Sequence, residues 1–306
     1  MGSRSAAAKE ERRRPLTRAE LVADFLVHLG LVVGSAVVLV PNLWIVSRAL
    51  DPRNISQPTS LRLIPEGGSL GAFDRVLTEP LAHSVMVSTM LKNSLIVSAR
   101  VALSVVVLAV SAAYAFSRLQ SPGRTWGLFP FIGVLMPPQV ATLAPLFVLL
   151  SRIKPFGMVE SIRTTLAGVG VAYISGAPPF ATWNLRGYID TIPREVEEAA
   201  LIDGARSNWA FVDVAFPLIL PAIAITVLFG FMASWTECIL AWTFLTAPSR
   251  FALAMGLSSM VGQCSSNTPW SEFAAMAILI TLPIGVLFFQ LQRWIVSGLV
   301  VGGVKG

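Results

Sequence analysis

The stretch EVEEAALIDGARSNWAFVDVAFPLILP runs from Glu195 to Pro221 and separates two long apolar runs. Its first half is acidic and rich in alanine, and two prolines lead into the apolar run that follows. It carries no recognisable set of catalytic side chains. A polar segment held between apolar runs is typical of a loop that emerges from a membrane, and the rest of the chain supports that interpretation.

The composition around this stretch is that of a chain that crosses a membrane several times. Of its 306 residues, 54% are hydrophobic and 13% are charged, and the mean hydropathy is +0.70. About 20 apolar residues cross a bilayer as a helix, whereas barrel strands need short alternating segments. We therefore predict an all-α integral membrane protein with six transmembrane helices and a cytoplasmic loop between helices 4 and 5. The six spans are Phe25–Ser47, Asn93–Phe116, Trp126–Leu150, Thr164–Trp183, Leu218–Leu245 and Phe273–Val296.

Lys and Arg residues predict the orientation, because cytoplasmic segments carry an excess of both. A basic cluster precedes the first apolar run, and segments on its side of the membrane hold more Lys and Arg than the opposite segments. We therefore predict that both termini and the Glu195–Pro217 region are cytoplasmic. The net charge of +6 is spread over the chain, so we expect no nucleic-acid binding. The cluster consists of Arg4, Lys9, Arg12, Arg13, Arg14 and Arg18.

Motifs that carry enzyme chemistry are missing from the sequence. It contains no G-x-x-x-x-G-K-[ST] phosphate loop, no H-E-x-x-H zinc motif and no G-x-S-x-G nucleophile. The only histidines are His28 and His83, and we expect His28 to pack as a neutral imidazole. Cys238 and Cys264 lie in different kinds of segment and support neither a disulfide nor a metal site. We expect no catalytic residue, and no metal or cofactor bound by this chain.

Two ionisable residues lie inside predicted spans, where charge is costly and often functional. Glu237 lies in the outer half of the fifth span, and two interpretations weigh equally. It faces a polar cavity and a substrate hydroxyl, or it makes a hydrogen bond between helices. For Arg100 we favour a structural role, since its long side chain can reach the interface.

Proline pairs interrupt the third and fourth spans. Pro137-Pro138 and Pro178-Pro179 each remove backbone donors and kink a helix. Freed carbonyls at membrane depth are tolerated where they line a cavity or are buried in protein, so a translocation path and simple kinked packing both fit. Gly30 and Gly34 place two small residues on one helix face, which predicts close helix packing.

The opening stretch predicts a short helix from Pro193 to Asp203. Proline suits a first helical turn, acidic residues suit the positive end of the helix dipole, and alanine is a strong helix former. Gly204 follows where a helix ends in a left-handed residue. We expect Ser207 to cap a second short helix that carries Trp209, Val212 and Phe216. Pro217 and Pro221 then mark the start of the fifth span.

The order of these residues resembles a known family. The pattern E-A-A, three residues, G, nine residues and V-A-F-P is similar to the EAA loop of permease subunits of binding-protein-dependent ABC importers. The longer run Glu197–Ala205 resembles the carbohydrate-uptake branch. The segments LKNSLIVS, AYAFSRLQSPGR, MPPQVATLAPLFVLL and QRWIVSGLVVGGVKG extend the likeness over most of the chain. The ending is similar to the second permease of maltose/trehalose-type transporters.

The resemblance implies an ATP-driven sugar importer for disaccharides or oligosaccharides, in a bacterial-type inner membrane. Its partners would be a second permease, two cytoplasmic ATPase copies that bind ATP and Mg, and an extracytoplasmic sugar-binding protein. The domains would be a tail at 1–24, the permease domain at 25–297 with its coupling loop at about 184–216, and a tail at 298–306. The residues coupled to the ATPase would be Glu197, Glu198, Ala199, Ala200, Asp203, Gly204, Ala205 and Pro217. The tail residues in contact with the ATPase would be Gly302, Gly303, Val304 and Lys305.

Candidate substrate-path residues are Gln139, Thr142, Trp235 and Glu237. Trp235-Thr236-Glu237 stands where the branch often reads W-N-[DE], which is a departure from the pattern. Two other classes of protein compete with the importer. A secondary transporter driven by an ion gradient would need its own ion site, and only Arg100 and Glu237 are ionisable at depth. A membrane scaffold would change no substrate flux.

Overall fold

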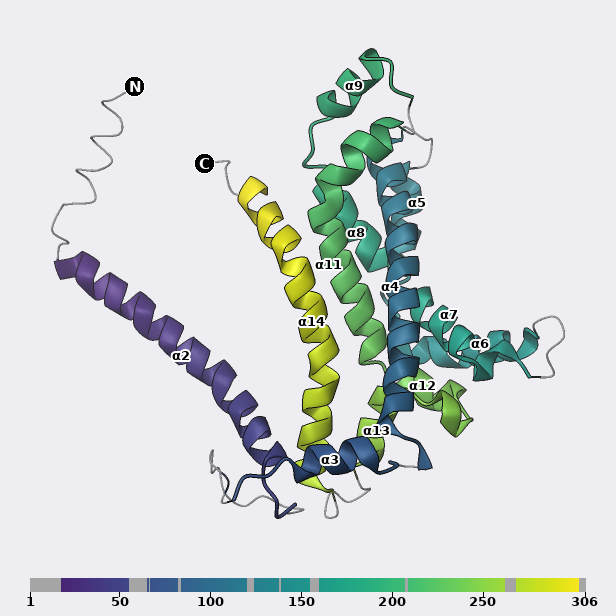
Figure 1. Cartoon of the computed structure of the whole chain (residues 1–306). Helices are drawn as coiled ribbons and strands as arrows, with labels where there is room; N and C mark the ends of the chain where they lie inside the picture. Colours follow the sequence, from purple (N-terminus) through teal and green to yellow (C-terminus); the bar gives the residue numbers. More distant parts are fainter. Residues whose placement is uncertain are drawn as a thin grey trace.

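The computed structural model describes residues 18–54, 65, 67–81, 84–119, 124–137, 139–154, 160–206, 209–261 and 268–302. Within these ranges the chain forms helices joined by turns, without a strand. Figure 1 shows three long helices that lie nearly side by side, α4 (Val87–Arg118), α11 (Phe216–Trp235) and α14 (Trp270–Gly302). The prediction of an all-helical fold is confirmed in these regions.

The core lies between α4, α11 and α8 (Pro178–Ile189), with α14 against the other side of α11. Small residues bring the helices together: a Cβ added at Gly230 would lie 3.4 Å from the Ala102 Cα atom. Trp235 ends α11 only 1% exposed, stacks on Phe231 and donates from its indole Nε1 to the Ile280 carbonyl over 3.1 Å. Burial of such large side chains stabilises each by about 1.5–3 kcal/mol.

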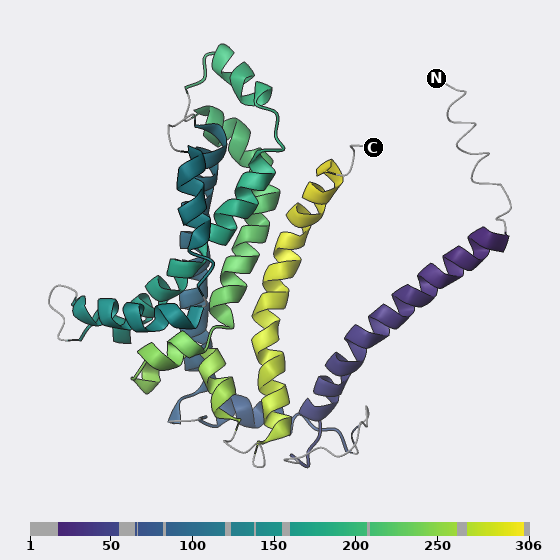
Figure 2. The ribbon, with the colours of Figure 1, turned by 180° about the vertical axis from the view of Figure 1, so that it is seen from behind.

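Helix α2 (Arg18–Ala49) stands away from this core. Figures 1 and 2 show it joined to the bundle at one end and diverging along its length. Its most apolar 18-residue window has 0% of its residues buried, although it is apolar enough to cross a membrane. Burial begins only at Ser47, Arg48 and Ala49. Within the described chain α14 contacts α2, but most of the large apolar side chains of α2 stay exposed.

The third and fourth predicted spans are not continuous helices. The third is divided into α5 (Arg124–Gly133) and α6 (Gln139–Arg152), and the fourth into α7 (Leu166–Gly176) and α8. Proline removes a backbone donor and clashes with the preceding turn, which explains breaks beside Pro137 and at Pro178. Figure 1 shows α6 and α7 lying across the direction of α4.

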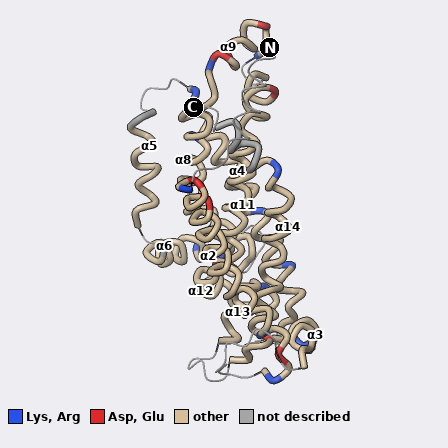
Figure 3. The backbone as a smooth tube through the Cα atoms, turned by 90° about the vertical axis from the view of Figure 1, so that its left-hand side faces the viewer, with Lys and Arg blue, Asp and Glu red and all other residues tan. Residues whose placement is uncertain are grey.

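The fifth predicted span is also shorter than expected. Helix α11 ends at Trp235, and the chain turns before α12 (Ile239–Phe244). Among the described residues, four helical stretches are long and apolar enough to cross a membrane. They are Arg18–Ala49, Val87–Arg118, Ala210–Trp235 and Trp270–Ile295. The long helices are almost free of charge over most of their length (Figure 3).

The two ends of the bundle carry different short elements. At one end lie α3 (Gly71–Thr78) and α13 (Leu253–Ser259). At the other lies α9 (Glu195–Ile202), and α14 ends toward the same side (Figures 1 and 2). Two 3-10 turns, η2 (Ile162–Thr164) and η4 (Pro248–Arg250), join the helices that lie across the bundle.

Candidate functional site

The helix in the opening stretch is shorter than predicted, at Glu195–Ile202, but it ends as the sequence indicates. Gly204 has φ +91°, a left-handed conformation that favours glycine. The Gly204 amide donates to the Leu201 carbonyl over 3.1 Å, and the Ala205 amide donates to the Ala200 carbonyl over 3.0 Å. These two bonds form a Schellman motif, which satisfies carbonyls that the helix end would otherwise leave open.

Glu197 ties this helix to the end of α4. Its Oε1 atom accepts from Arg118 Nε over 2.6 Å, and its Oε2 atom accepts from the Tyr114 hydroxyl over 2.9 Å. Both charged side chains are nearly buried, at 8% exposed for Arg118 and 11% for Glu197. A charge-assisted pair with further hydrogen bonds on both partners holds its geometry well.

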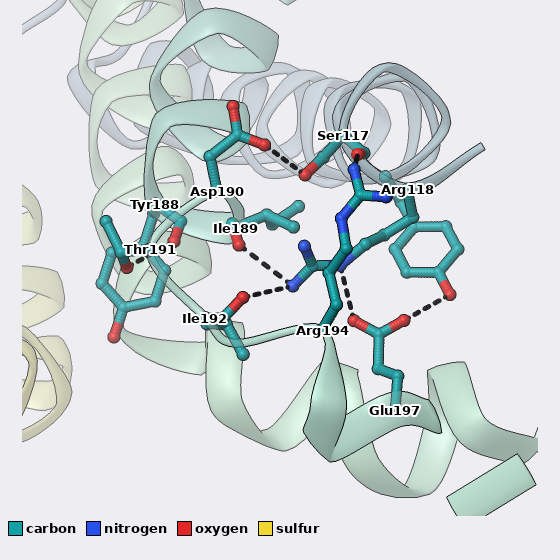
Figure 4. Close-up of polar contacts among 10 residues, drawn as sticks. Ser117, Arg118, Tyr188, Ile189, Asp190, Thr191, Ile192, Arg194 and Glu197 are labelled. Atoms are coloured by element: carbon teal, nitrogen blue, oxygen red, sulfur yellow. Dashed lines mark hydrogen bonds and ion pairs between the residues drawn. The ribbon is translucent and has the colours of Figure 1, made fainter. Parts of the chain in front are cut away.

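The same arginine also binds the backbone that leads into α9. Arg118 Nη2 donates to the carbonyls of Ile189 over 3.1 Å and Ile192 over 2.8 Å (Figure 4). Arg194 returns the contact by donating to the Ser117 carbonyl over 2.9 Å, and the Ser117 hydroxyl donates to the Asp190 carboxylate. The Arg118 network, formed by Tyr114, Ser117, Arg118, Asp190, Arg194 and Glu197, therefore fixes the polar loop on α4 from both sides.

The opposite face of α9 is open. Glu198, Ala199 and Asp203 are exposed, and Ile202 is 86% exposed. Val196 and Leu201 are also exposed large apolar side chains. A rigid helix that presents small, acidic and apolar side chains outward is suited to contact another protein. Sequence reasoning did not find Arg118 or Tyr114, because one sequence does not show which basic residue at a span end meets which loop acid.

The second half of the stretch is not a separate helix. The backbone is π-helical at η3 (Ala210–Ala215) and continues without a break into α11, so the prediction of a second short helix is wrong. Pro217 follows the π-helical residues, and the helix passes through it without a break. Phe211 packs on Tyr114 with ring centroids 4.5 Å apart. Ser207, the predicted cap, lies outside the described residues.

A second candidate site is a cavity of about 500 Å³ beside the breaks between the helices. Residues of α4, α6, α7 and α11 line it, together with the break after α5 and the turn before α12. Its polar lining is four hydroxyl residues and one carboxylate, Thr142, Tyr173, Ser175, Ser234 and Glu237.

Glu237 has defined partners at this cavity. Its carboxylate accepts from the backbone amides of Ile239 over 3.1 Å and Leu240 over 3.0 Å, at the start of α12. At the other end of α12, Arg163 Nη1 donates to the Phe244 carbonyl over 3.2 Å. Opposite charges at the two ends of a helix complement its dipole.

Other residues singled out in the sequence are not among the described residues that line this cavity. Trp235 packs in the core and is absent from the cavity lining, and Arg100 is exposed on α4. Gln139 begins α6, and its side chain lies outside the description. Gly302 is the last residue of α14, while Gly303, Val304 and Lys305 lie outside the described residues. Thr142 and Glu237 are thus the predicted pair that the structure brings together.

These features describe a bundle of apolar helices, several of them long enough to cross a membrane, with a polar loop fixed to one end of the bundle. The family described as "Binding-protein-dependent transport system inner membrane component" matches residues 105–301. The chain belongs to this family. It is a permease of an ABC sugar importer of the MalG type.

Relatives match along nearly the whole chain. The maltose/maltodextrin permease MalG of Escherichia coli (strain K12) is 33% identical over 92% of this chain and 96% of its own length. The maltodextrin permease MdxG of Bacillus subtilis (strain 168) is 34% identical over 94% and 98%. The galactooligosaccharide permease GanQ of the same organism is 32% identical over 91% and 94%.

Solved structures share the fold. A bacterial ABC transporter involved in the import of the acidic polysaccharide alginate matches with a TM-score of 0.72 at 18% identity, covering 92% of this chain and 99% of the other. A bacterial alginate ABC transporter in complex with a pentasaccharide-bound periplasmic protein matches with a TM-score of 0.53 at 15% identity, over 67% of this chain and 77% of the other.

Proposed function

We propose that this chain is one permease subunit of an ATP-driven, binding-protein-dependent importer of disaccharides or oligosaccharides of the maltose/trehalose type. Family membership and three oligosaccharide-transporting relatives support the sugar class. The observation that carries the coupling role is α9, which is locked to α4 on one face and exposed on the other. Such a helix can pass force between a bound partner and the membrane bundle.

In this proposal α9 docks into a cleft on a cytoplasmic ATPase subunit, and the ATPase pair binds ATP and Mg. Glu198, Ala199 and Asp203 would contact the ATPase, while Glu197 would act inward through Arg118. Closure of the ATPase dimer would move α9 and α4 together, and so shift the bundle between two packed states. The tail at Gly302–Lys305 would also reach the ATPase.

A second permease would cover the exposed face of α2. A groove of about 380 Å³ lies between α2 and α14, lined by side chains that include Ile45, Val46 and Phe289. A Cβ added at Gly30 or Gly34 would meet nothing within 4 Å in this chain, so the small face of α2 is open to another helix. These openings suit a heterodimer, with lipid around its rim.

The proposed orientation places α9 and both termini in the cytoplasm of a bacterial cell. The basic cluster before α2 supports it, because such clusters are retained inside. The end that carries α3 and α13 would then face outward and receive the sugar-binding protein. An ion-gradient-driven transporter is not favoured, because the family and its relatives are subunits of binding-protein-dependent systems.

Reconstitution of the permease with its partners tests the function. Glu198→Lys and Gly204→Pro should abolish sugar uptake and uncouple ATP hydrolysis from the binding protein, while the chain still inserts into the membrane. Glu79→Lys, an exposed acid at the opposite end, is the control and should leave ATPase copurification unchanged. Normal uptake by both loop variants would refute the coupling role. Sugar uptake by this chain alone, driven by a gradient without ATP, would favour the alternative.

A further inference from the structure

The cavity beside α12 has an unbalanced charge. Thr142, Tyr173, Ser175 and Ser234 contribute hydroxyl groups to its lining, and Glu237 contributes a carboxylate. None of the described residues that line it is Lys, Arg or His. A cavity with low-dielectric walls and charge of one sign focuses a field on anything that enters it.

The carboxylate is held at a defined position. Three contacts of 3.0–3.2 Å join its two oxygens to the amides of Ile239 and Leu240. Backbone amides at the start of a helix complement a carboxylate and hold its oxygens in place. Glu237 therefore presents a fixed negative charge to the cavity.

Arg163, a cation that contacts α12, has partners away from the cavity. Arg163 donates to the carbonyls of Thr243 and Phe244 at the far end of α12, and its guanidinium lies 4.5 Å from the centre of the Phe147 ring. It does not belong to the lining of the cavity. The negative charge of Glu237 is thus unpaired by any cation that faces the cavity within the described chain.

We propose that Glu237 is a specificity-determining residue that excludes anionic sugars and admits neutral ones. A uronate or sugar phosphate in this cavity would be repelled by the carboxylate, whereas a neutral sugar would bind its hydroxyls to the hydroxyl lining. This proposal rests on the proposed transport of sugars through this chain. In this proposal Glu237 selects substrates by charge, whereas Trp235 packs in the core.

The charge of the cavity can be measured without any sugar. In the complete transporter, Cys238→Ser and Cys264→Ser remove the native thiols of this chain, and Thr142→Cys places a thiol in the lining. The same transporter without Thr142→Cys gives the background reaction of the other subunits. The rate of reaction with a trimethylammonium-ethyl methanethiosulfonate is then compared with that of the sulfonatoethyl reagent. With Glu237 present we expect the cation-to-anion ratio of rates to be about tenfold higher than with Glu237→Gln.

Glu237→Asp is the matched control, because it keeps the charge and should keep most of the preference for the cation. Glu237→Gln keeps an oxygen that accepts from the α12 amides, so the helix start is preserved. A ratio of rates that is the same in all three proteins would overturn the proposal. It would mean that the carboxylate does not act on the contents of the cavity.

Uptake measurements test the consequence for transport. In the reconstituted importer, the ratio of maltotriose uptake to uptake of its uronate-terminated counterpart should fall at least threefold in Glu237→Gln. An unchanged ratio, or loss of maltotriose uptake in this variant alone, would overturn the specificity role. A different outcome would separate the two proposals. If neither the wild type nor the variant transports either sugar, but the thiol reaction still depends on Glu237, the proposed function is wrong and the effect of Glu237 on the charge of the cavity is still supported.

Discussion

Removing Arg118 should release the coupling loop from α4 without unfolding the bundle. Arg118→Met keeps the length and the apolar stem of the side chain but leaves Glu197 without its ion pair. Breaking a buried pair by removing one partner typically costs about 3–5 kcal/mol. Both side chains keep some exposure, at 8% and 11%, so we take the lower end of this range, about 3 kcal/mol, as the cost of removing Arg118. This cost corresponds to about a 100-fold rise in the ratio of molecules with a released loop to molecules with a docked loop.

Hydrogen–deuterium exchange of the purified permease, without its ATPase partner, measures this release. Peptides that cover Glu195–Arg206 should exchange up to about 100-fold faster in Arg118→Met. Glu198→Gln changes a neighbouring exposed acid on the same helix and should exchange like the wild type. The double variant Arg118→Met/Glu197→Gln should recover part of the protection, because neither buried charge is then left alone. Equal exchange in Arg118→Met and Glu198→Gln would refute the role of the ion pair.

Three further changes probe the loop and the helices that lie across the bundle. Gly204→Ala should lower uptake more than Gly204→Asn, since asparagine adopts positive φ more readily; equal activities would contradict a need for the φ of +91°. Gly168→Ala should lower the thermal stability of the solubilised permease by several degrees, because its Cβ would overlap the Ile162 carbonyl, whereas Gly170→Ala meets only Val101 at 3.9 Å and should be mild. Arg163→Gln should lower the stability of the permease by about 1–3 kcal/mol, because the carbonyls at the end of α12 lose their donor. The exposed Arg152→Gln should change the stability little, and equal melting temperatures of the two variants would contradict a role of Arg163 in capping α12.

Local chemistry was enough to predict several features of the fold and the site. Long apolar runs required helices, and Gly204 after an acidic, alanine-rich run required a left-handed helix end. The placement of Glu197 between Arg118 and Tyr114 depended on packing between segments about 80 residues apart, for which a single sequence holds no signal. Trp235 shows the same limit. Its indole could serve a sugar or a core equally well, and only the neighbouring α14 decides between them.

The breaks within spans show a different limit. The proline pairs indicated where helices would be interrupted, but they did not indicate whether the two halves would remain collinear. In the structure α6 and α7 turn across the bundle, and this brings Thr142 close to Glu237 at one cavity. Proline pattern alone predicts a kink, and the direction of the kink depends on what the freed half packs against.

The π-helical turn at Ala210–Ala215 affects the rotation, about the axis of α11, at which the preceding loop joins that helix. Its wider turn takes up extra residues compared with an α-helix of the same rise. In an α-helix one residue corresponds to a rotation of about 100°. The rotation at which the chain enters α11 therefore depends on the number of residues in Ala210–Ala215. The loss or gain of one residue there would set this rotation against the position at which the Arg118 network holds α9, while every side chain of α9 stayed the same.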